Sequence, residues 1–70
     1  MRLIDFVKLI DKSVHITLFF NDYSVEDYDS KLNIPSKYYD YIVEWFVPWG
    51  LMDIQITVRS LKNGKNLYFN

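Results

Sequence analysis

Residues 51–60, LMDIQITVRS, alternate between apolar and polar side chains more strictly than any other part of the chain. Ile54, Ile56 and Val58 fall on one side, and Gln55 and Thr57 fall on the other. A strand with one buried face and one solvated face has this pattern. We therefore predict a β-strand over 51–60.

A second alternating segment, VHITLFF at 14–20, predicts another strand. Asn21 and Asp22 follow it, and both residue types tolerate the left-handed conformations that a tight turn requires. The return strand, at about 23–32, is interrupted by Asp27 and Asp29. Charges of this kind discourage further pairing, so we expect an edge strand there.

The N-terminal segment 2–10 favours a short amphipathic helix. Its apolar residues Leu3, Phe6, Val7 and Ile10 have the spacing i, i+3, i+4 and i+7. A second short helix is predicted at 35–40.

The segment 36–47 allows two interpretations. The helix at 35–40 could extend to 46, with Pro48 ending it. Alternatively, 41–47 is a strand that turns at 47–50 and pairs with 51–60, which would put Val43 beside Ile54 and Trp45 beside Met52. We favour the hairpin.

At the C-terminal end, Asn63-Gly64 is a strong hairpin signal, because both central residues of a type I′ turn need positive φ. Residues 67–69 would return as a short edge strand. The sequence thus predicts one α+β domain over 1–70. It comprises a short N-terminal helix, an antiparallel sheet of two or three hairpins, and one short helix.

The composition limits what can stabilise the chain. Seventy residues bury only about 60% of the surface that the unfolded chain exposes. The chain has no cysteine and one histidine, which excludes disulfides and argues against a structural zinc site. We therefore expect a homo-oligomer, with a dimer as its simplest form.

The same composition argues against membrane insertion and metal binding. No apolar run approaches the roughly 18 to 20 residues of a membrane span. Asp5, Lys8 and Asp11 interrupt the N-terminal apolar stretch, so it is no signal peptide. Calcium loops need an early glycine, and the first glycine is Gly50. We expect neither metal nor cofactor.

The residues offer little for catalysis. His15 is the single histidine, and a general base needs a neighbouring nucleophile and an orienting group. The serines lie at breaks between elements, where capping and turn roles account for them. We therefore expect a non-enzymatic protein.

Acidic residues are concentrated in the middle of the chain. Six acids and two lysines lie between residues 21 and 44, although the net charge is only −1. Such a run can be a solvated face that keeps an edge soluble, or it can imitate a phosphate backbone. Together with exposed aromatic residues it gives our candidate partner-binding set: Asp22, Tyr23, Glu26, Asp27, Tyr28, Asp29 and Trp49.

Two Trp, six Tyr and five Phe make the chain rich in residues that concentrate at binding sites. Few basic residues lie among them, so we expect no direct binding of nucleic acid. An alternative is a small ligand, such as a nucleotide, held between subunits. Its phosphate would be bound by Arg2, Lys12, Arg59 and Lys62.

The residues LIDFVKLID at 3–11 and VHITL at 14–18, followed by Ile34-Pro35 and 53–56, resemble small proteins encoded by phages and prophages of low-GC Gram-positive bacteria. The likeness covers 2–58, and the tail after Ser60 departs from it. It implies a protein of the bacterial cytoplasm that binds and blocks a host protein, as anti-CRISPR and other counter-defence inhibitors do. Nucleotide sequestration and a structural role in the virion are the alternatives.

Overall fold

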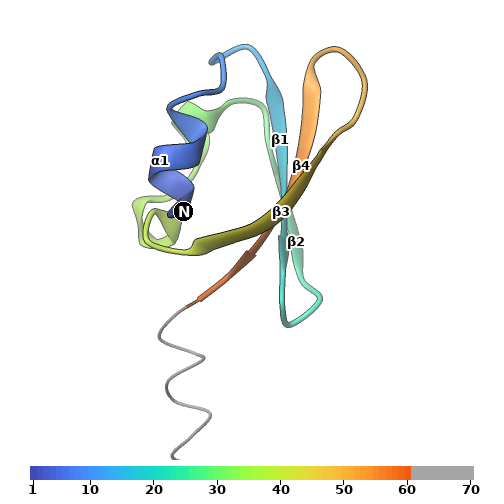
Figure 1. Ribbon diagram of the computed structural model, residues 1–70. Coiled ribbons are helices and arrows are strands. Elements are labelled where there is room, and N and C mark those ends of the chain that lie inside the picture. Colours follow the sequence, from blue (N-terminus) through green and yellow to red (C-terminus); the bar gives the residue numbers. More distant parts are fainter. Residues whose placement is uncertain (61–70) are drawn as a thin grey trace, which may run out of the picture.

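A four-stranded sheet forms the centre of the fold, with α1 and two 3-10 turns packed on one side of it (Figure 1). The computed structural model describes residues 1–60. The elements are α1 (Leu3–Val7), β1 (His15–Phe20), β2 (Val25–Tyr28), η1 (Lys31–Asn33), η2 (Ser36–Tyr38), β3 (Ile42–Pro48) and β4 (Asp53–Arg59).

The strands lie in the order β2-β1-β4-β3. Each hairpin, β1 with β2 and β3 with β4, is antiparallel, as predicted. The two hairpins meet through β1 and β4, which run parallel with Ile16 beside Ile54 and Leu18 beside Ile56. The prediction of a purely antiparallel sheet is therefore wrong, and the sheet is mixed.

The core lies between the sheet and the helical layer. Ile16 and Leu18 of β1, and Ile56 and Val58 of β4, have no exposed surface. Leu3 of α1 is equally buried against them. Burying a side chain of this size contributes about 1.5–3 kcal/mol, so the alternation at 14–20 and 51–60 selects this face for the interior.

The N-terminal helix is confirmed, but it is shorter than 2–10. Its start is joined to the strand layer, because the backbone N–H of Leu3 donates to the carbonyl of Tyr41 at 2.7 Å. The N–H of Val43 donates to the carbonyl of Met1 at 2.9 Å. These two hydrogen bonds use backbone groups at the start of β3, on the side of the strand that faces away from β4.

The first hairpin is confirmed, with β2 as a short edge strand. In the turn Tyr23, rather than Asn21 or Asp22, has the positive φ of 71°. Asp22 instead accepts hydrogen bonds from the backbone N–H and the hydroxyl of Ser24.

The second hairpin forms, but its predicted register is wrong. Val43 lies beside Val58 instead of Ile54, and Trp45 lies beside Thr57 instead of Met52. A bulge between Val43 and Trp45 shifts the register, so these two side chains lie on opposite faces. The turn is also longer than predicted and contains Gly50 at a φ of +88°.

The segment 36–47 does not form one helix. Within the predicted helix 35–40, only Ser36–Tyr38 forms a 3-10 turn, and β3 follows.

The predicted turn at Asn63-Gly64 and the strand at 67–69 lie outside the described residues. β4 already pairs with β1 on one side and β3 on the other.

Candidate functional site

One face of the sheet is covered by α1 and the 3-10 turns, and no element among residues 1–60 covers the other (Figure 1). We call the second face the open face. It carries the alternate side chains of the same strands: His15, Thr17 and Phe19 of β1, Val25 and Asp27 of β2, Trp45 and Val47 of β3, and Asp53, Gln55, Thr57 and Arg59 of β4. We include Asp29, which contacts His15, and Glu44, which contacts Arg59.

The centre of the open face is apolar. Phe19 and Trp45 flank a shallow hollow of about 200 Å³ over Gln55 and Thr57. Trp45 is 58% exposed and Val25 is 50% exposed. Large apolar side chains grouped on an uncovered sheet are typical of an interaction surface rather than of a solvated one.

One end of the open face is a polar group centred on His15. Its Nε2 lies 3.6 Å from an oxygen of Asp27, and its Nδ1 lies 3.6 Å from an oxygen of Asp29. The hydroxyl of Thr17 donates to Asp27 at 2.6 Å. This hydrogen bond, assisted by His15, holds the pKa of Asp27 below its ordinary value, so the carboxylate stays charged.

This geometry does not suit general-base catalysis. A catalytic histidine needs one ring nitrogen directed at a nucleophile and the other at an orienting group. Both ring nitrogens of His15 face carboxylates, and the hydroxyl of Thr17 is bonded to Asp27. In this arrangement the ring nitrogens of His15 face carboxylates rather than a hydroxyl.

The open face is acidic overall. Asp53 lies at the same end as His15, and Arg59 at the far end contacts Glu44 at 3.2 Å. Four carboxylates, those of Asp27, Asp29, Glu44 and Asp53, thus accompany one guanidinium. The surface suits a partner that has an apolar centre and a basic rim.

The structure distributes the predicted partner-binding residues over four places. Asp27 and Asp29 lie together on the open face. Asp22 and Tyr23 lie in the β1–β2 turn, where Tyr23 is 95% exposed. Trp49 lies in the β3–β4 turn at the opposite end of the sheet.

The two remaining residues of that set, Glu26 and Tyr28, lie on the covered side of β2. The hydroxyls of Tyr28 and Tyr38 both donate to the Glu26 carboxylate, the second at 3.0 Å. These bonds lower the pKa of Glu26. Burial, followed by the bond to Glu26, raises the pKa of Tyr28. The three side chains join β2 to η2.

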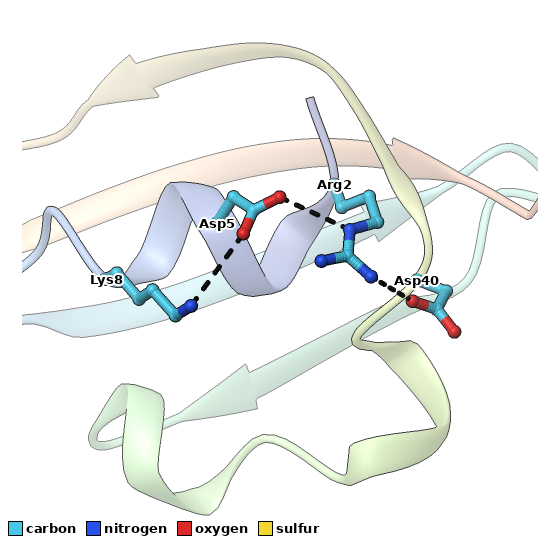
Figure 2. A network of polar contacts seen from close by, with 4 residues as sticks. All are labelled: Arg2, Asp5, Lys8 and Asp40. Atoms are coloured by element: carbon cyan, nitrogen blue, oxygen red, sulfur yellow. Dashed lines mark hydrogen bonds and ion pairs between the residues drawn. The ribbon is translucent and has the colours of Figure 1, made fainter.

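The predicted phosphate-binding residues are not assembled into one site. Figure 2 shows Arg2 between Asp5, at 3.3 Å, and Asp40, at 3.0 Å. Arg59 is paired with Glu44, and Lys12 lies in the loop between α1 and β1. Lys62 is outside the described residues.

The sequence prediction missed the aromatic part of the open face. Phe19 alternates with buried neighbours, so the β1 pattern places it on the half-exposed face with His15 and Thr17, but it was not among the candidate binding residues. Trp45 could not be placed in the same way, because the bulge reverses its direction. The sequence feature that could have indicated the bulge is the run of three apolar residues at 45–47, directly after Glu44, because such a run breaks strict alternation.

No protein-family model, no curated protein and no solved structure matches the chain. The resemblance to small phage proteins therefore depends on the residues quoted for it. Among residues 1–60, no helix is long and apolar enough to cross a membrane.

Proposed function

We propose that the chain is a non-enzymatic protein that binds a host protein through the open face and inhibits or modulates that protein's activity. The observation that carries the proposal is the uncovered sheet face, on which Trp45 and Phe19 flank a hollow and carboxylates gather at the end near His15. Exposed aromatic residues of this kind concentrate binding free energy.

The charge of the open face supports a basic partner. Surfaces of opposite charge accelerate encounter and disfavour the wrong partners. The resemblance to phage proteins favours a bacterial host protein, including one of a defence system that binds nucleic acid. Such a protein has a basic groove, and the carboxylates of Asp27 and Asp29 would occupy it as phosphates do.

A second copy of this chain fits the open face less well. Two such faces in contact would bring the four carboxylates of one copy close to the four of the other. Each face has only one arginine to offset this repulsion. Light scattering over about a hundredfold range of concentration tests this point. A dimer that is lost in Trp45→Ser would mean that a second copy covers the open face, and it would contradict the proposal.

The proposal is tested by capture followed by measurement of affinity. The full chain is immobilised, proteins of a Gram-positive host extract are captured, and each purified candidate is titrated with the native chain and variants. We expect Trp45→Ser to lower the affinity for the partner at least about tenfold, since a central aromatic residue contributes about 2 kcal/mol or more to the free energy of binding. The native chain should also change the partner's activity.

Leu32→Ser is the matched control. Leu32 is 71% exposed and lies in η1, on the side of the sheet opposite Trp45. The substitution should leave the affinity for the protein partner unchanged. If Trp45→Ser binds the partner as tightly as the native chain, the open face is not the binding surface.

A further inference from the structure

Three lysines surround a solvent-accessible hollow on the covered side of the sheet. Lys8 follows α1, Lys12 lies in the loop before β1, and Lys31 begins η1. They line a hollow of about 480 Å³ together with Leu9, Ile10 and Leu32. Two segments separated by about twenty residues thus bring their ammonium groups to one place.

The hollow has a net positive charge. Its single acid, Asp11, accepts hydrogen bonds from the backbone N–H of Ser13 at 2.9 Å and from the Ser13 hydroxyl. Lys12 and Lys31 lie close enough to Asp11 to contribute to the lowering of its pKa, after the larger effect of Ser13. The lining thus holds three lysines and one carboxylate, and a second carboxylate, that of Asp5, lies 3.9 Å from Lys8 outside the lining.

A smaller apolar hollow adjoins the first. It has a volume of about 180 Å³ and is lined by Ile4, Val7 and Tyr39. Lys8, Lys31 and Leu32 border both hollows. A ligand placed across this border would have an apolar or aromatic body beside Tyr39 and a multiply charged anion among the lysines.

We infer that these adjoining hollows bind an organic polyphosphate with a ring system, namely a nucleoside di- or triphosphate. The base would contact Tyr39 and Leu32, and the phosphates would be bound by Lys8, Lys12 and Lys31. Lysine binds phosphate as a compact charge with three donors, without needing a fixed geometry. The 3.9 Å contact between Lys8 and Asp5 is exposed and easily replaced (Figure 2).

This site differs from the open face in position and charge. It also differs from the set Arg2, Lys12, Arg59 and Lys62, of which only Lys12 belongs to it. Arg2 and Arg59 do not line either hollow; Arg2 lies between Asp5 and Asp40, and Arg59 contacts Glu44. The inference is therefore independent of the proposed protein-binding function.

The test is a titration of the isotope-labelled full chain, followed through its backbone amide resonances, with ATP, pyrophosphate and adenosine as separate probes. We expect ATP to shift the amides of 8–12, 31–32 and 39, and to bind more tightly than pyrophosphate or adenosine. Absence of shifts at millimolar ATP would overturn the inference. Equal binding of ATP and pyrophosphate would also overturn it, because the apolar hollow would then be unused.

Variants divide the site into its two parts. The triple variant Lys8→Gln, Lys12→Gln and Lys31→Gln should weaken ATP binding about tenfold or more, since each exposed charge contributes modestly. Leu32→Ser should weaken the binding of ATP but not the binding of pyrophosphate. Lys37→Gln, which removes a lysine outside both hollows, is the matched control. If the triple variant binds ATP as the native chain does, the lysines are not the site.

Discussion

The covered and open faces of the sheet are built from the same four strands, yet they have opposite properties. On the covered face, Ile56 and Val58 of β4 are completely buried. On the open face, Thr57 lies between them in sequence and beside the exposed Trp45 in space. Side chains that alternate with a period of two thus separate the buried core from the uncovered surface.

The comparison also shows where polar groups are tolerated. On the covered side, Glu26 is held by the hydroxyls of Tyr28 and Tyr38 and serves the fold. On the open side, Asp27 and Asp29 flank His15, and Asp29 remains 98% exposed. Carboxylates one residue apart along β2 therefore have different roles according to the face on which they lie.

The largest expected effect is the loss of a core side chain. Ile56→Ala should lower the free energy of unfolding by about 2–5 kcal/mol, because it removes buried methyl groups and leaves a cavity. Thr57→Ala, one residue along on the open face, should cost less than about 1 kcal/mol. Urea denaturation followed by circular dichroism measures both. Similar losses for the two variants would contradict the assignment of the faces.

The next effect concerns the polar group on the covered face. Glu26→Gln removes the charge that accepts two tyrosine hydrogen bonds and should lower the free energy of unfolding by about 1 kcal/mol near neutral pH. Chemical denaturation at a series of pH values measures the effect. Asp40→Asn, which removes an exposed carboxylate paired only with Arg2, is the control.

The pH dependence follows from the same three residues. Since the pKa of Glu26 is lowered, its contribution is present above its ordinary value of 4.5 and is lost as the pH falls through the lower folded value. Since the pKa of Tyr28 is raised, its contribution is present below 10.0 and is lost as the pH rises toward the folded value. Glu26→Gln should remove the acidic limb and only part of the alkaline limb, because burial is the larger cause of the raised pKa of Tyr28. An alkaline limb as steep in Glu26→Gln as in the native chain would contradict the bond between Glu26 and Tyr28.

The smallest expected effect is electrostatic and concerns the open face. Asp29→Lys should leave the free energy of unfolding nearly unchanged, because the side chain is almost fully exposed. It should lower the affinity for the protein partner several-fold and reduce the salt dependence of binding. Asp40→Lys, an exposed charge reversal near α1, is the control. Equal salt dependence for the two variants would remove the electrostatic part of the proposal.

Much of the fold was predictable, because alternation identifies which side chains of a strand share a face. β1, β4 and the first hairpin were found in this way. Alternation does not say which strands are neighbours. The parallel pairing of β1 with β4 depends on contacts between segments almost forty residues apart, for which the local pattern carries no signal.

The site was less predictable for a related reason. Asp27 and Asp29 were identified, but Glu26 and Tyr28 were grouped with them although they lie on the opposite face. The bulge after Val43 decides whether Trp45 is buried or exposed, and one extra residue reverses that outcome. Likewise Lys8 and Lys31 meet only because η1 packs beside the end of α1.

The most direct test of the open face is the accessibility of Trp45 in the presence of the captured protein partner. In Trp49→Phe, Trp45 is the single tryptophan of the chain. Biosynthetic labelling of this variant with 7-azatryptophan, which is excited at longer wavelength than the partner's tryptophans, lets acrylamide quenching report on that side chain in the complex. We predict efficient quenching of the free chain and a marked decrease when the partner is bound. Quenching that stays unchanged at saturating partner would show that the open face remains uncovered, and would contradict the account.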